Sequence, residues 1–315
     1  MNTSAQFIKG LSEHDETLVR TTPKADLHNH GILGGRLADL ERLLGQTLPA
    51  APKKVTLFKD FDHYIDHVLG VAFAFGDPPG KTGLEMLFTL AFEQAVRDHL
   101  TVLEMSIDSR FATFYPDKAA GFVRALKNIH QAVAPEISFL PELGIARDVA
   151  LLDAYAQADD FLATDYFNSI DLYGDEFAQK ASAYQDLYRQ AKKAGIKLKA
   201  HVGEYGDAQS VRQTVELLEL AAVQHGISSV NSKEVMNFLR DNHIQLNICP
   251  TSNVVLSRVP TLKQHPIREL FDHGIKVTVN TDDLMIFGQS VSQEFINLHD
   301  CGLFSAKELD VIRCN

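Results

Sequence analysis

The chain has 315 residues, of which 45% are hydrophobic and 23% charged, a composition typical of a globular protein with a sizeable core rather than a disordered or fibrous chain. Lysine and arginine number 30 against 41 aspartates and glutamates, and the formal net charge of −11 argues against nucleic acid as a partner. The cysteines, Cys249, Cys301 and Cys314, lack CxxC spacing, which disfavours disulfides and thiolate metal sites and favours a reducing, cytoplasmic location.

The first 22 residues are polar and are interpreted as an N-terminal extension. Within them an amphipathic stretch, residues 7–19, predicts a short helix that closes one end of the fold. The extension lacks the apolar segment of a secretory signal, and no later run approaches the ~20 apolar residues of a membrane span. We therefore expect no membrane association.

Pro23 precedes the first predicted strand, residues 24–30. His28 and His30 are two positions apart in it, so both side chains point to the same face. A glycine-rich loop follows, and leucines at helical spacing predict a helix over residues 36–44.

Residues 58–75 carry aromatic and apolar side chains at helical intervals. They predict a helix that either packs in the core, the simpler interpretation, or covers a pocket. The next segment, GDPPGKT over residues 76–82, is similar to a phosphate-binding loop. However, a P-loop needs four residues between its glycines, and this one has three, two of them prolines without an N–H group. We interpret it as a connecting loop.

From residue 84 onwards, predicted helices and strands alternate. The predicted strands are 24–30, 101–107, 137–145, 168–172, 196–201, a brief one near His225, 244–248 and 275–280. The predicted helices of this part are 84–99, 117–134, 147–158, 178–194, 208–220, 232–242 and 266–271. Alternation implies parallel pairing, and eight strands favour an α/β fold of the (β/α)8 TIM-barrel type, formed as one domain over residues 1–315. An open doubly wound sheet is the alternative, but its glycine fingerprint is absent after the first strand.

In a barrel the carboxyl ends of all strands share one rim, so polar residues at those ends meet around one pocket. The residues in question are His28, His30, His201, Glu204, His225, Asp282 and Asp283. Each alone has an ordinary interpretation as an edge, turn or helix-capping residue. Together, at the ends of strands one, five, six and eight, three imidazoles and a carboxylate favour a zinc site with an open position for water, leaving a histidine and a glutamate as candidate base and acid.

The sequence around these residues resembles the adenosine and AMP deaminase family of zinc-dependent amidohydrolases. PKADLHNH resembles the motif of its first strand, HVGE that of the fifth and QHG that of the sixth. CPTSN and the later HPIRELFDHGIKVTVNTDD resemble its seventh and eighth strands. The resemblance runs from about Pro23 to the end of the chain.

The resemblance implies a ligand set and a set of roles. The implied ligands of a single zinc ion are His28, His30, His201 and Asp282, the last of which also belongs to the catalytic set. Glu204 would give a proton to purine N1, and His225 would orient and help to deprotonate the attacking water. Asp283 would hydrogen-bond purine N7, and the backbone N–H of Gly174 would meet N3.

The implied reaction is the hydrolytic deamination of a small-molecule 6-aminopurine, most simply adenosine to inosine and ammonia. Adenine, a modified adenosine, an adenine nucleotide or another cyclic amidine are alternative substrates. A catalytically silent purine-binding relative is an alternative of another class, but it predicts a damaged metal or acid position, and all seven residues are present.

Three positions depart from the family pattern. Ile32 stands where relatives that bind adenosine or adenine usually place a carboxylate, Leu284 where a proline commonly follows the two aspartates, and Gln224 where a glycine precedes the histidine. The loss of the carboxylate predicts weak use of adenosine unless Asp108 or Ser109 replaces it.

The relatives also continue for a further helix beyond the last residues of this chain. We therefore expect apolar side chains near strands one and eight to be exposed or to be covered by a partner chain.

Overall fold

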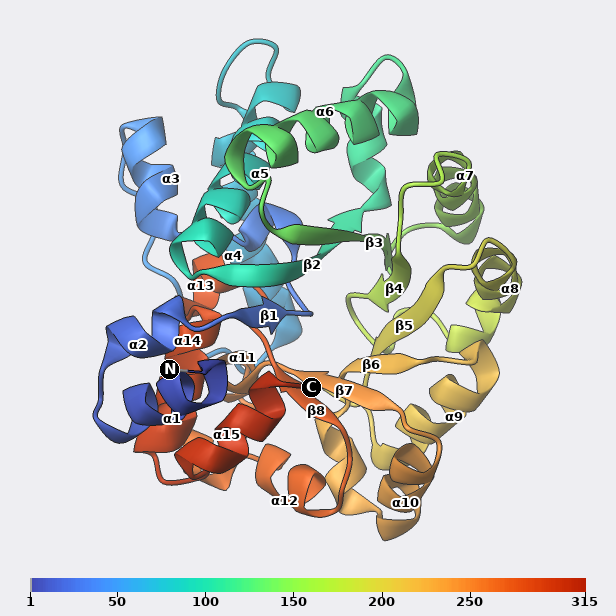
Figure 1. Cartoon of the computed structure of the whole chain (residues 1–315). Helices are drawn as coiled ribbons and strands as arrows, with labels where there is room; N and C mark the ends of the chain where they lie inside the picture. The colour runs from blue at the N-terminus through green and yellow to red at the C-terminus, as the bar shows by residue number, and fades with distance from the viewer. Residues whose placement is uncertain (1) are drawn as a thin grey trace.

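The computed structural model describes residues 2–315, and its centre is one sheet of eight parallel strands in the order β1 to β8 (Figure 1). The strands are β1 (Lys24–Asp26), β2 (Leu100–Asp108), β3 (Ser138–Ala146), β4 (Ser169–Tyr173), β5 (Lys197–Val202), β6 (Ala222–His225), β7 (Gln245–Ile248) and β8 (Val277–Val279). Each strand pairs with the next in the chain. The predicted (β/α)8 barrel is confirmed.

Helices surround the strands on the outside (Figure 1). The α-helices are α1 (Thr3–Ser12), α2 (Glu16–Thr21), α3 (Leu37–Leu44), α4 (Phe58–Phe73), α5 (Lys81–Arg97), α6 (Lys118–Val133), α7 (Leu151–Leu162), α8 (Gln185–Lys193), α9 (Ala208–Leu218), α10 (Lys233–Asp241), α11 (Pro250–Val255), α12 (Ile267–Asp272), α13 (Leu284–Phe287), α14 (Val291–Asp300) and α15 (Ala306–Arg313). The 3-10 helices are η1 (Gly31–Leu33), η2 (Ser109–Phe114), η3 (Ala181–Tyr184), η4 (Ile227–Asn231) and η5 (Leu262–Gln264). Over residues 2–315, no helix has both the length and the apolar character needed to cross a bilayer.

The barrel closes where the chain leaving β8 meets the chain leaving β1. The side-chain oxygen of Asn280 accepts a hydrogen bond from the backbone N–H of Leu27 at 2.8 Å. The backbone N–H of Asp282 donates to the carbonyl oxygen of His28 at 3.0 Å, and Asn29 forms an isolated bridge with Asp282. Closure therefore places Asp282 directly beside the two histidines that follow β1.

Several predicted elements have other bounds in the structure: helix 147–158 is α7, helix 178–194 is divided into η3 and α8, and strand 275–280 is shortened to β8. Strand β1 has three residues, whereas seven were predicted, because the segment after Asp26 makes only isolated bridges, one to Asp282 and one to Ser106 of β2. The helix predicted over residues 7–19 is divided into α1 and α2, because His14 between them adopts a left-handed φ of 54°. The GDPPGKT segment connects α4 and α5, as predicted, only up to Gly80, because Lys81 and Thr82 already belong to α5.

A second hydrophobic cluster, separate from the main core, lies over the carboxyl ends of the strands. Its members come from α4 and from segments that follow β1, β7 and β8, and they include Leu33, Phe61, Val68, Leu256, Met285 and Phe287. The ring of Phe61 in α4 stacks on that of Phe287 in α13, with centroids 5.7 Å apart. Helix α4 therefore packs in a core and also covers the rim, which combines the two interpretations of residues 58–75.

The N-terminal extension covers the outer surface near β1 and β8. Phe7 of α1 is fully buried and meets Phe295 of α14 edge to face at 5.2 Å, while Leu309 of α15 is also fully buried. The Arg313 guanidinium donates to the carbonyl oxygen of Pro23 at 2.8 Å. Helix α1 lies beside α15 in Figure 1. Helices α1 and α2 therefore cover most of the surface that was expected to be open, while Val311 of α15 is 54% exposed.

Candidate metal and catalytic site

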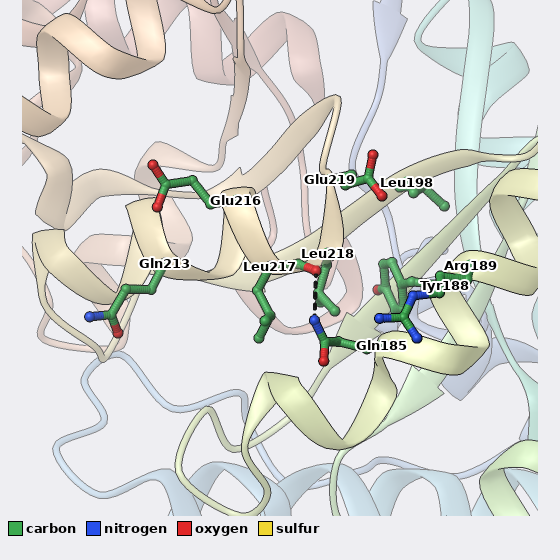
Figure 2. Close-up of a pocket in the computed structure, with 9 residues that line it drawn as sticks. All are labelled: Gln185, Tyr188, Arg189, Leu198, Gln213, Glu216, Leu217, Leu218 and Glu219. Atoms are coloured by element: carbon green, nitrogen blue, oxygen red, sulfur yellow. Dashed lines mark hydrogen bonds between the residues drawn. The ribbon is translucent and has the colours of Figure 1, made fainter.

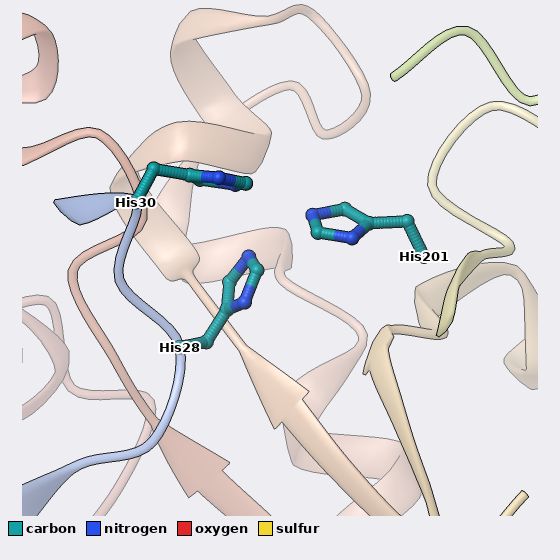
Figure 3. Close-up of side chains that lie close together, drawn as sticks. All are labelled: His28, His30 and His201. Carbon is teal, nitrogen blue, oxygen red and sulfur yellow. The ribbon is translucent and has the colours of Figure 1, made fainter. Parts of the chain in front are cut away.

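Three histidines converge at the carboxyl end of the barrel. His28 and His30 follow β1, and His201 belongs to β5. Figure 3 shows their rings turned toward a common centre, and one nitrogen of each lies within 4.8 Å of those of the others. The sheet thus brings together side chains that are more than 170 positions apart in the chain, as the barrel prediction required.

Asp282 completes this group. Its Oδ1 atom lies 3.6 Å from Nε2 of His28 and 3.4 Å from Nε2 of His30. Four ligands placed tetrahedrally at the usual ~2.0–2.1 Å from a zinc ion are about 3.3 Å from one another. The observed spacing therefore suits a single small divalent cation.

The His28 side chain supports this fit independently. It is fully buried, and neither of its ring nitrogens has a hydrogen-bond partner within residues 2–315. A buried imidazole without partners is costly unless it serves another purpose, and metal coordination is one such purpose. Burial lowers the pKa of His28 well below its usual value, that of His30 to about 4 and that of His201 to about 3, so all three are neutral and able to ligate.

Asp171 of β4 orients one of the histidines, and no sequence pattern had singled it out. Its Oδ1 atom is hydrogen-bonded to Nδ1 of His201 at 3.1 Å. A carboxylate at this nitrogen holds the imidazole proton there and leaves Nε2 free to bind a metal. The sequence feature that could have identified Asp171 is its position in DLYGDE, two residues before Tyr173 on the strand face that points into the barrel.

Glu204 and His225 lie next to the histidine group. Nε2 of His225 is 3.8 Å from Oε2 of Glu204 and 3.7 Å from Oδ2 of Asp282. Burial, reinforced by the charges of Asp282 and Glu176, raises the pKa of Glu204 well above its usual value. The raised pKa favours the protonated form of Glu204, which suits a proton donor.

Two of the site residues have unusual backbone conformations. His225 has a φ of 62° and Asp282 a φ of 59°, both in the left-handed region. For a residue with a side chain this conformation costs on the order of 1–3 kcal/mol and persists only where the surrounding structure imposes it. Such positions concentrate at functional sites, and these two lie beside one another.

The two residues predicted to contact substrate lie on the same rim. Asp283 is buried, and burial together with the charge of Asp282 raises its pKa well above the usual value. Gly174 follows β4 directly, with a φ of 91° that favours glycine. Its neighbour Tyr173 has its ring centroid 5.4 Å from that of His30. The structure therefore brings all the predicted site residues to one end of the barrel.

Glu176 is a further residue that the sequence did not indicate. Its Oε1 atom accepts the backbone N–H groups of Glu204 at 2.8 Å and Tyr205 at 2.7 Å, and its Oε2 atom accepts those of Gly203 at 2.9 Å and Gly206 at 3.2 Å. One carboxylate thereby fixes the whole turn that carries Glu204. Nothing in the sequence distinguishes it from its neighbour Asp175.

The position of the missing carboxylate is apolar. Ile32 lies in η1 and packs against both hydrophobic clusters. Of the two possible replacements, Ser109 bonds to Gln157 of α7 at 2.8 Å and so does not serve the site. The other, Asp108, already accepts two hydrogen bonds at its Oδ2 atom, one from the Tyr173 hydroxyl at 2.5 Å and one from an Arg110 N–H.

A groove of about 660 Å³ lies elsewhere, on the outside of the barrel between α8 and α9. Figure 2 shows its lining, which includes Gln185, Tyr188 and Glu216, and the hydrogen bond of 3.4 Å from Gln185 Nε2 to the carbonyl oxygen of Leu217. None of the site residues described above lines this groove. We therefore place the candidate chemistry at the barrel rim and not in this groove.

Comparison with known proteins bears directly on this site. The sequence profile described as adenosine deaminase matches residues 23–315, which include every residue of the site. The chain belongs to the adenosine deaminase family. This confirms the resemblance found in the sequence motifs.

Individual proteins similar to this chain include deaminases and an amidohydrolase. A protein of Treponema pallidum, provisionally named an adenosine/adenine deaminase, is 33% identical over 290 residues, covering 91% of this chain and 94% of its own. The crystal structure of an adenine deaminase from Arthrobacter aurescens has a TM-score of 0.74 at 24% identity, covering 88% of this chain and 87% of its own. An amidohydrolase from Burkholderia ambifaria, solved with bound zinc, has a TM-score of 0.69 at 21% identity, covering 89% and 80%. At these identities the two solved structures support the fold.

The Glu176 contacts generate a testable prediction for this family member. In Glu176→Gln the amide nitrogen cannot accept, so two of the four N–H groups of the turn lose their partner at a cost of about 1–3 kcal/mol each. We expect faster hydrogen exchange at the amides of residues 203–206 and reduced activity. Exchange mass spectrometry measures the first effect, with Asp175→Asn as the neighbouring control. Unchanged exchange at these amides would show that the turn does not depend on Glu176.

Proposed function

We propose that this protein is a zinc-dependent aminohydrolase that deaminates a 6-aminopurine compound, most simply adenosine to inosine and ammonia. The observation that carries the proposal is the convergence of three imidazoles and Asp282 beside Glu204, a largely buried carboxyl group whose pKa is raised by burial. Membership of the adenosine deaminase family supports it. The partner is then a small-molecule purine, in keeping with an acidic chain.

His28, His30, His201 and Asp282 would hold the zinc ion. When bound, zinc would lower the pKa of water to about 7 and so supply a nucleophile at neutral pH. One ion per chain is proposed, because residues 168–174, which include β4, offer no lysine that could be carbamylated to bridge a second.

Glu204 would act as the acid. Its buried carboxyl group would transfer a proton to purine N1, which makes C6 electrophilic as water adds there. The C6–N6 bond then breaks: one of the two protons of the water goes to the amino nitrogen, which leaves as ammonia, and the other returns to Glu204. N1 keeps the proton from Glu204, which gives the lactam form of inosine.

The remaining residues would position the reactants. Asp283, whose pKa is raised by burial and by the charge of Asp282, would donate to purine N7, and the backbone N–H of Gly174 would donate to N3. His225 would orient the attacking water from its place between Glu204 and Asp282. Whether it also removes the water's proton depends on which of its ring nitrogens already carries one.

The apolar surroundings of Ile32 favour a substrate with little polarity at purine N9. A modified adenosine with a less polar or bulkier N9 substituent is therefore favoured, and adenosine, adenine and an adenine nucleotide are kept as candidate substrates. The organisation of residues 1–315 as one domain and a cytoplasmic location stay predictions.

The metal is tested by removing it. We expect one zinc ion per chain by metal analysis, loss of adenosine deamination on chelation and recovery on adding zinc. His28→Asn should reduce zinc binding and activity together, whereas His99→Asn, at an exposed position, should change neither. Two ions per chain, or activity that survives complete chelation, would contradict the proposed centre.

The role of Glu204 is tested by Glu204→Gln. The amide has no proton acidic enough for N1, so we expect zinc content to be kept while kcat falls by about 100-fold or more. The decrease in absorbance near 265 nm as adenosine becomes inosine gives the rate. Glu216→Gln, the same change at the outer groove, is the control. Near-normal turnover by zinc-replete Glu204→Gln enzyme would assign the acid to another residue.

The substrate is tested with a panel of adenosine, 2′-deoxyadenosine, 5′-deoxyadenosine, methylthioadenosine, adenine and AMP. A buried hydroxyl without an acceptor loses roughly 1.5–3 kcal/mol, so we expect a poor KM for adenosine and higher kcat/KM for less polar or bulkier N9 substituents. Ile32→Asp should raise kcat/KM for adenosine but not for 5′-deoxyadenosine, and Ile32→Leu is the control. A strong preference of the unmodified enzyme for adenosine over its 5′-deoxy analogue would mean that Asp108 accepts the hydroxyl.

A further inference from the structure

A chain of buried polar side chains leads from outside the site to both candidate catalytic residues. His265 lies between η5 and α12, and Asn253 belongs to α11; both are buried, at 2% and 0% exposure. Their hydrogen bonds go to each other, to Ile267, to His225 and to Glu204, and none of these is a proposed metal ligand. Their arrangement determines how protons are distributed in the site.

This series of hydrogen bonds begins at a backbone N–H group, which can only donate. The backbone N–H of Ile267 donates to Nδ1 of His265 at 3.1 Å, so Nδ1 carries no proton. Burial lowers the pKa of His265 to about 3, which keeps the ring neutral and leaves its one proton on Nε2. Nε2 lies 3.2 Å from Oδ1 of Asn253 and donates to it. The Asn253 amide is thereby held with its oxygen toward His265.

The nitrogen of the Asn253 amide consequently faces the catalytic side. Nδ2 lies 3.2 Å from Nδ1 of His225 and 3.4 Å from Oε1 of Glu204. An amide NH2 group has two protons and cannot accept, so it offers one to each. Nδ1 of His225 is then an acceptor, and the proton of the neutral ring is on Nε2.

We propose that Asn253, held in place by His265, is a positioning residue that sets the tautomer of His225 and orients Glu204. His225 then presents Nε2–H toward Glu204 and Asp282, so it holds the attacking oxygen as a donor and does not take its proton. Oε1 of Glu204 is occupied by Asn253, which leaves Oε2 to carry the acid proton. The assignment of catalytic roles rests on the proposed function, but the tautomer itself does not.

A purely structural role for the pair would satisfy buried groups without selecting a tautomer. The two roles separate in Asn253→Asp, which is nearly isosteric. The carboxylate can only accept, so Nδ1 of His225 would have to donate, and the ring proton would move to Nδ1. Loss of stability alone would not produce that change.

The test is 15N NMR of the full-length, zinc-loaded protein labelled at histidine, since ring 15N shifts distinguish the two tautomers. The signals of His225 are assigned by their loss in His225→Gln. We expect Nε2–H in the unmodified protein and Nδ1–H in Asn253→Asp, with kcat reduced about 10- to 100-fold and KM little changed. Asn242→Asp, at the exposed end of α10, should alter neither.

A second pair of variants tests His265. His265→Leu removes the donor that orients the amide, so we expect a mixture of His225 tautomers, whereas His265→Gln retains a donor and should restore Nε2–H. Nδ1–H in the unmodified protein would overturn the proposal, even if no variant folds. An unchanged Nε2–H signal in Asn253→Asp and His265→Leu would overturn it as well. Because these spectra need no substrate, failure to deaminate any aminopurine would be recognised separately.

Discussion

Closure of the barrel between β8 and β1 is the constraint on which the site depends. The backbone bonds that join Asp282 to His28 are the same bonds that bring a carboxylate from the end of the chain to two imidazoles from its beginning. The third imidazole, that of His201, comes from β5, which is separated from β1 in the sheet by β2, β3 and β4. A register error of one residue at the closing joint would turn these side chains away from one another, because alternate residues of a strand face opposite sides.

Burial then prepares the chemistry by acting on acids and bases in opposite directions. Removal from water disfavours every charged form, so it lowers the pKa of the histidines, which favours rings able to donate lone pairs, and raises the pKa of Glu204 and Asp283, which favours carboxyl groups able to donate hydrogen. Two opposite requirements, ligation and proton donation, are thus met by one property of the location. The left-handed backbones at His225 and Asp282 show that the surrounding structure also bears a conformational cost to hold this arrangement.

The sequence was informative where a residue's role depended on its place in a repeating pattern. Alternation of strands and helices predicted the barrel, and the barrel predicted that His28, His201 and Asp282 would meet. The sequence was silent where a role depended on a partner far along the chain. Glu176 resembles any loop carboxylate until its four N–H donors are seen, and the relation of Asn253 to His265 depends on amide orientation. The length of β1 was overestimated because the alternating sequence pattern continues to His30, whereas regular pairing with β2 ends at Asp26.

The anchoring of residues 203–206 by Glu176 joins two loops that the barrel would otherwise leave independent. Glu176 is two residues from Gly174, so the segment proposed to recognise purine N3 is also the segment that sets the place of Glu204. A ligand that failed to engage Gly174 would therefore leave the acid displaced. Discrimination among purines would then be expressed in the chemical step more than in affinity, because the energy of recognition is used to align the proton donor.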